Sequence, residues 1–174
     1  MNSAWWTILR AFGGICTLQR APQDIPRSNA LLAVTSGANI VLSVIIYGLK
    51  SPFGDALLKA LLETAVLFAT TFALLFLLSY GRRLVQTLTA LMGSGAILGG
   101  VALLTMLLAP ALPPDLGLAI LRVNLLLNLI VIAHILRHAV STWFLVGLLF
   151  AFGYAIVVNK SFTIINAMLG AAPT

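Results

Sequence analysis

The sequence predicts an all-α fold, a polytopic membrane helix bundle with five transmembrane helices and an N-terminal interfacial amphipathic helix. Of the 174 residues, 61% are hydrophobic and 8% are charged, whereas a typical soluble domain is about 25% charged. A domain of this length has too little interior to bury so much apolar surface. Lipid must therefore solvate most of the chain, and five apolar stretches approach the roughly 20 residues that a helix needs to cross a bilayer.

Residues 1–28 are predicted to form a cytoplasmic amphipathic helix, over about Ser3 to Leu18, and a proline-rich linker. The apolar stripe at helical spacing consists of Trp5, Leu9, Phe12 and Ile15. An indole ring suits the headgroup region because it can bury its ring while its N–H stays wet. The expected interfacial anchors are therefore Trp5, Trp6 and Arg10. A helix that docks on a partner is the alternative interpretation of the same pattern.

Residues 29–158 are predicted to form the transmembrane domain, and residues 159–174 a short extracytoplasmic tail. The expected spans are Ala30 to Leu49, Asp55 to Tyr80, Leu84 to Leu108, Leu116 to Val140 and Thr142 to Val158. Ser28 or Asn29 can cap the first span, and Asp55 suits the positive N-terminal end of the second. The prolines of Ala109 to Asp115 predict a non-helical loop.

Small residues on two of the predicted spans indicate close helix packing. Gly95 and Gly99 form a GxxxG pair, a pattern that lets two backbones approach closely. Gly147 and Ala151 begin a similar stripe on the last span. Packing inside the chain is favoured over a specific dimer contact, since GxxxG pairs are common in membrane helices.

The distribution of cations predicts the orientation in the membrane. With five spans and a cytoplasmic N-terminus, the inner side receives Arg10, Arg20, Arg27, Arg82, Arg83 and Arg137. The outer side receives Lys50 and Lys160 in its loops. Cytoplasmic loops carry an excess of Lys and Arg, so we expect a bacterial inner (plasma) membrane protein with its C-terminus outside the cytoplasm.

Several polar residues interrupt the apolar spans. They are Lys59, Glu63, Arg122, Asn124, Asn128 and His134. Ionisable groups in hydrocarbon are costly and normally face the protein interior or a water-filled cavity. Glu63 and Arg122 lie at similar depths, roughly 12 Å and 9 Å along their helices. We therefore expect a Glu63–Arg122 ion pair, with Lys59 snorkelling outward from the same face as Glu63.

Asn124 and Asn128 stand one turn apart on the fourth span, followed by His134. Their stripe predicts either hydrogen bonds between helices, which we favour, or a polar track from the outer face toward His134. His134 and His138 have an i, i+4 spacing that can bind a metal. Because no further ligand is near in sequence, we expect no metal site.

The residues exclude several function classes. No nucleophile elbow, phosphate-binding loop or zinc motif is present, and four acidic residues leave few candidates for acid–base catalysis. We therefore expect no enzyme, no catalytic residue and no cofactor. The net charge is +6, but Arg82-Arg83 is the largest basic cluster, so nucleic-acid binding is not expected. Cys16 is the single cysteine and cannot form an intramolecular disulfide.

Two stretches resemble small inner-membrane proteins of proteobacteria: LQRAPQDIPRSNALL before the first span and AHILRHAVS before the last. In its five-span layout and cytoplasmic N-terminus the chain is similar to Yip1-like membrane proteins, although it lacks the long hydrophilic N-terminal domain of eukaryotic members. The resemblance implies a membrane-organising or accessory role and no catalytic residue.

The expected function is a non-enzymatic accessory or scaffold subunit that packs against a larger membrane complex. Its partners would be the lipid bilayer and another integral membrane protein or further copies of the chain. The alternative is a small transporter or channel component that uses the intramembrane polar track. A membrane-embedded enzyme is a third class, for which no motif is present.

Overall fold

The computed structural model describes residues 4–168, and within them it contains helices and no strand. The long helices are α1 (Ala4–Cys16), α2 (Asn29–Gly48), α3 (Phe53–Leu77), α4 (Leu84–Leu108), α5 (Pro114–Ala139) and α6 (Phe144–Met168). Short 3-10 turns lie at η1 (Pro22–Asp24), η2 (Gly81–Arg83) and η3 (Ala109–Ala111). Five of the helices, α2 to α6, are long and apolar enough to cross a membrane. The all-α membrane bundle is thus confirmed.

Helix boundaries follow the local signals of the sequence in most places. The Ser28 hydroxyl accepts a hydrogen bond from the Leu31 amide at 3.2 Å, which caps α2 as predicted. The predicted bounds of α4 match those observed, and Asp55 lies in the first turn of α3. The proline loop was predicted wrongly as non-helical: it contains η3, and α5 begins at Pro114. Proline is tolerated there because the first helical residue needs no amide donor.

The end of the last span was also predicted wrongly. Helix α6 continues to Met168, ten residues beyond the expected end at Val158. The segment Asn159 to Ala167 contains no proline or glycine to stop a helix. Residues 169–174 of the predicted tail lie outside the described residues.

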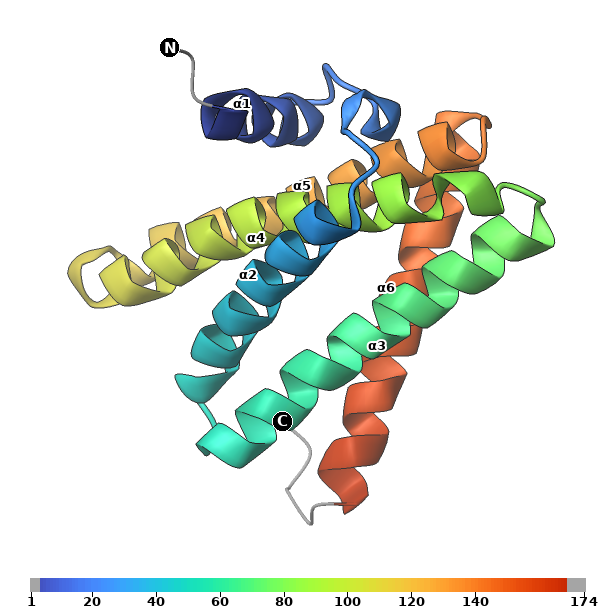
Figure 1. Ribbon diagram of the computed structural model, residues 1–174. Coiled ribbons are helices and arrows are strands. Elements are labelled where there is room, and N and C mark those ends of the chain that lie inside the picture. Colours follow the sequence, from blue (N-terminus) through green and yellow to red (C-terminus); the bar gives the residue numbers. More distant parts are fainter. Residues whose placement is uncertain (1–3, 169–174) are drawn as a thin grey trace.

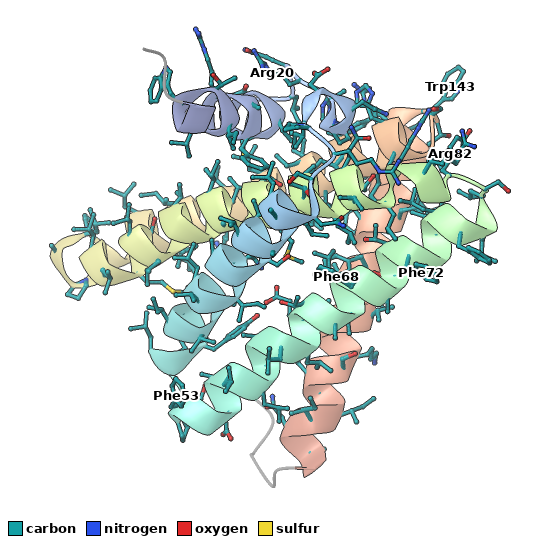
Figure 2. All side chains as sticks on the ribbon, in the orientation of Figure 1. Arg20, Phe53, Phe68, Phe72, Arg82 and Trp143 are labelled. Carbon is teal, nitrogen blue, oxygen red and sulfur yellow. The ribbon has the colours of Figure 1, made fainter. Side chains whose placement is uncertain are left out.

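One end of the bundle, which we call the α1 end, brings together α1, η1, η2 and the turn between α5 and α6 (Figure 1). The Arg83 guanidinium donates to the carbonyls of His138 (3.0 Å) and Ala139 (2.9 Å), and to Ser141 Oγ (2.7 Å). The Gln86 amide donates to the Ile25 carbonyl at 2.9 Å. Figure 2 shows Arg20, Arg82 and Trp143 at this end and Phe53 at the opposite one.

Helix α1 lies alongside α4 and packs on α4 and α5 (Figure 1). Phe12 and Ile15 are buried, and the Phe12 ring lies directly against Gly93 of α4. The predicted stripe is thus partly wrong, because Leu9 is 56% exposed while Ala11 is buried. Of the predicted interfacial anchors, Trp6 and Arg10 are exposed, and the side chain of Trp5 lies outside the described residues.

The apolar core is concentrated toward the α1 end. Phe12 and Ile15 of α1 join Leu91 and Leu98 of α4 and Ile135 of α5 in one cluster. A smaller cluster holds Leu75 of α3 against Ala139 and Val140. Helix α4 is the central element, since it packs on α1, α2, α3 and α5. The bundle is therefore closed at the α1 end.

Small residues bring the helices together inside the chain. A Cβ on Gly95 would lie 2.8 Å from Asn39 Oδ1 of α2, and one on Gly147 would collide with the Ala133 carbonyl oxygen of α5. A Cβ on Gly99 would be in ordinary contact with Ile46, at 3.8 Å, and Ala151 is fully buried. Within the chain, these small residues lie at the contacts between α2 and α4 and between α5 and α6.

Candidate functional site

Midway along the bundle, against the apolar core, lies a cavity of about 200 Å³ that we call the Glu63 cavity. Each of the five long apolar helices contributes polar side chains to its wall. These are Asn39, Ser43 and Tyr47 of α2, Glu63 and Thr64 of α3, Ser94 of α4, Asn124 and Asn128 of α5, and Tyr154 of α6. Aliphatic side chains, among them Leu42, Ile46 and Leu67, make up the rest of the wall, so the cavity has a mixed polar and apolar lining.

The cavity lies near the middle of the spans. Glu63 is ten residues from the start of α3, Asn124 ten from the start of α5 and Tyr154 ten from the start of α6. At 1.5 Å per residue each is about 15 Å from its helix end, and the hydrocarbon core of a bilayer is about 30 Å thick. The polar groups therefore meet near the middle of the long helices.

The carboxylate of Glu63 is bound by two hydroxyls of α2. Tyr47 donates to Glu63 Oε2 at 2.9 Å, and Ser43 donates to the same oxygen at 3.4 Å. Within residues 4–168, Oε1 accepts no hydrogen bond and no Lys, Arg or His lies at ion-pair distance from the carboxylate. One carboxylate oxygen is thus held in place while the other is left for an occupant of the cavity.

The predicted Glu63–Arg122 ion pair is wrong. Arg122 is exposed on α5, and Glu63 bonds to α2 instead. The depths of the two residues do match, but an ion pair also requires both side chains to point into one interface. Helix α3 packs chiefly on α2, so the rotation of α3 aims Glu63 at the neighbouring hairpin helix. Lys59, one turn earlier on α3, is half-buried and forms no ion pair within the described chain.

The two asparagines have different surroundings. Asn124 donates to the Leu98 carbonyl of α4 at 3.2 Å, so the predicted bond between helices is present. Asn128 lines the Glu63 cavity one turn further along α5. Both residues face this cavity, and the Asn124 bond holds α5 against α4 at its edge.

The predicted polar track does not continue to His134. The cavity wall on α5 reaches Val131 and Ile132, while His134 is buried at the α1 end and its Nε2 donates to the Arg20 carbonyl at 2.9 Å. The His134 and His138 rings lie 4.7 Å apart. In the described part of the chain, no group of three or more His, Cys, Asp or Glu side chains could hold a metal ion.

Three groups around the carboxylate were missed from the sequence. Asn39, Ser43 and Tyr47 are spaced at i, i+4 and i+8 and share one face of α2. Hydroxyl and amide residues at this spacing are common at contacts between membrane helices, so the sequence alone does not single them out. The buried hydroxyl of Thr64 also lines the cavity, and it has no hydrogen-bond partner among the described residues.

No protein-family model, curated protein or solved structure matches the chain. The class that fold and site define is a small helical membrane protein with a cavity midway along its five long apolar helices. The resemblance to Yip1-like proteins stays a prediction, and the function has to be argued from the cavity itself.

Proposed function

We propose that the protein is a small transporter or channel component that binds a cation or a proton at Glu63. The proposal rests on the Glu63 carboxylate, which lies in a cavity lined by all five long apolar helices. One of its oxygens accepts hydrogen bonds from α2, and the other accepts none from the described residues. A buried charge without a partner is costly, and intramembrane carboxylates commonly mark ion or proton pathways. The alternative function expected from the sequence is thereby preferred over an accessory subunit.

The polar groups of the cavity suit a small positively charged solute. Carboxylate, amide and hydroxyl oxygens all accept hydrogen bonds or coordinate hard cations. The cavity volume of about 200 Å³ is several times the roughly 30 Å³ that a water molecule takes in the liquid. A hydrated monovalent cation or a small amine therefore fits the space and the chemistry.

The test is flux in liposomes that contain the purified protein. The probes are H⁺, Na⁺ and tetramethylammonium, with Glu63→Gln as the variant and Asp115→Asn as the matched control. Asp115 is an exposed carboxylate in the first turn of α5, away from the cavity. We expect flux of at least one probe in the wild type and in Asp115→Asn, and loss of that flux in Glu63→Gln. Equal leaks from all samples and from protein-free liposomes would contradict the proposal.

An accessory role is the second candidate, and the outer face of α6 favours it. Leu145, Leu149, Phe152 and Ile156 form an exposed apolar ridge along one side of this helix. Such a ridge suits lipid, and it equally suits a helix of another membrane protein. Crosslinking from Leu145 in native membranes tests the second case, with Leu104 of α4 as the control on another face. A stoichiometric larger partner from Leu145 alone supports an accessory subunit.

For localisation, the proposal is a bacterial inner membrane with the α1 end in the cytoplasm. Support comes from Arg83, which joins η2 to the α5–α6 turn, and from Arg20 and Arg82 at the same end (Figure 2). These arginines follow the rule that cytoplasmic loops are basic. Reporter fusions at the Arg82-Arg83 turn are expected to be cytoplasmic, and an external reporter there contradicts the orientation.

A further inference from the structure

A second cavity, of about 300 Å³, adjoins the first between α3, α4, α5 and α6. Its walls are almost wholly aliphatic and aromatic, and include Leu74, Leu136, Phe150, Gly153 and Val157. The hydroxyl of Thr70, which also lines it, donates to the Val66 carbonyl of its own helix at 2.7 Å. This space, which we call the apolar cavity, therefore suits a hydrocarbon group.

The two cavities share part of their walls. Leu67 of α3, Leu91 of α4, Ile132 of α5 and Tyr154 of α6 line both. A cavity that contains a carboxylate is thus directly beside an almost wholly apolar one, which is open at the exposed residues Leu149 and Val157, and the same four helices line the boundary. One ligand can occupy both spaces if it carries a polar head and an apolar tail.

The charge of the site selects the head group. Glu63 has a free carboxylate oxygen and no cation at ion-pair distance in the described chain. An anionic head group would be repelled by this carboxylate at close range. An ammonium head group would be attracted to it, and this attraction offsets the free energy of removing the carboxylate from water. The apolar cavity has room for about ten groups the size of water or methylene, taking roughly 30 Å³ each.

We propose that the two cavities together bind an amphipathic cation, with its ammonium head beside Glu63 and its alkyl or aryl tail in the apolar cavity. This inference rests on the proposed function, because it names the class of solute that the Glu63 cavity takes. The observation behind this proposal is that the two cavities lie side by side. Na⁺ or H⁺ would occupy only the Glu63 cavity, whereas an alkyl or aryl tail would also fill the apolar cavity that four helices line.

The test is a binding series in lipid nanodiscs that contain the full chain. The probes are tetramethylammonium, butyltrimethylammonium and hexyltrimethylammonium, which share one head group and differ in tail length. Empty nanodiscs correct for partition into lipid. In the wild type, affinity rises with tail length, by up to about fourfold per methylene if the tail leaves water fully.

Two variants separate head from tail. Gly153→Leu adds a side chain at the wall of the apolar cavity, where a Cβ on Gly153 meets no atom within 4 Å. It removes the dependence on tail length and leaves tetramethylammonium binding unchanged. Gly100→Leu is the matched control, because a Cβ there also meets nothing within 4 Å and Gly100 lines neither cavity. Glu63→Gln weakens the binding of all three cations by tenfold or more.

The outcomes distinguish this inference from the proposed function. If tetramethylammonium binds through Glu63 but longer tails add nothing, or Gly153→Leu leaves the tail dependence intact, the amphipathic ligand is refuted and the cation site stands. If 1-hexanol binds as tightly as hexyltrimethylammonium and Glu63→Gln has no effect, the space takes neutral chains such as membrane lipid. In that case both proposals fail.

Discussion

Alanine at Gly147 tests how α6 is positioned, and hence how both cavities keep their shape. Gly147 lies in the first turn of α6, where its backbone touches the Ala133 carbonyl and Arg137 of α5. A Cβ would collide with that carbonyl oxygen and lie 3.0 Å from Arg137 Cβ, and a backbone atom cannot move aside as a flexible side chain can. Gly147→Ala must therefore push α6 away from α5.

The expected cost follows from overpacking. Extra methyl groups in a well-packed interior cost about 1–3 kcal/mol. Gly100→Ala is the matched control on α4: its Cβ meets nothing within 4 Å, and exchanging glycine for alanine inside a helix is favourable by up to about 1 kcal/mol. Because both variants make the same chemical change within a helix, the helix gain largely cancels, and they should differ by the overpacking cost of about 1–3 kcal/mol in unfolding free energy.

The assay is unfolding in mild detergent by titration with sodium dodecyl sulfate, followed by helix circular dichroism. We expect Gly147→Ala to unfold at a lower mole fraction of dodecyl sulfate than the wild type, and Gly100→Ala at an equal or higher one. If the two variants unfold together, α5 and α6 do not approach through Gly147. The position of Tyr154 in the cavity wall then loses its support.

Further outcomes are expected at the α1 end. Phe12→Ala removes the ring that covers Gly93 and should cost about 3–5 kcal/mol, exposing α1 to limited proteolysis, while Trp6→Ala, at a 61% exposed position, should change little. Burial raises the pKa of the Cys16 thiol to about 11, so the rate of maleimide labelling should be slow at pH 8 and rise toward pH 11. Labelling should be faster in Phe12→Ala, which uncovers the thiol. Fast labelling of the wild type at pH 8 contradicts this prediction. Arg83→Gln removes three hydrogen bonds to residues 138–141 and should speed hydrogen exchange there, whereas Arg82→Gln, at an exposed position, should not.

Helix ends could be predicted because they depend on residues next to one another. Ser28 caps α2 through an amide three residues away, and the bounds of α4 follow from the loop residues that flank an apolar run. The end of α6 was predicted wrongly at Val158, because the chain after this residue has no local signal that stops a helix before Gly170.

The partner of Glu63 could not be predicted, because it depends on how the helices are rotated against each other. Depth along a helix follows from counting residues, and depth alone made Arg122 a reasonable partner. Rotation is decided by packing, which turns Glu63 toward Tyr47 and leaves Arg122 exposed. The docking of α1 was missed similarly, since an apolar stripe fits a protein groove as well as it fits lipid.

The four acidic residues of the chain show why Glu63 needs a functional explanation. Asp24 accepts the Ala21 amide at 3.0 Å and closes the η1 turn. Asp55 and Asp115 lie in the first turns of α3 and α5, where the helix dipole stabilises a negative charge. Glu63 has neither position: it stands mid-helix, where a carboxylate stabilises no helix end and costs free energy in an apolar bundle. Glutamine there would still bond to Tyr47 and Ser43, so holding α2 against α3 does not require the charge. We therefore attribute this carboxylate to the proposed cation or proton site rather than to the contact between α2 and α3.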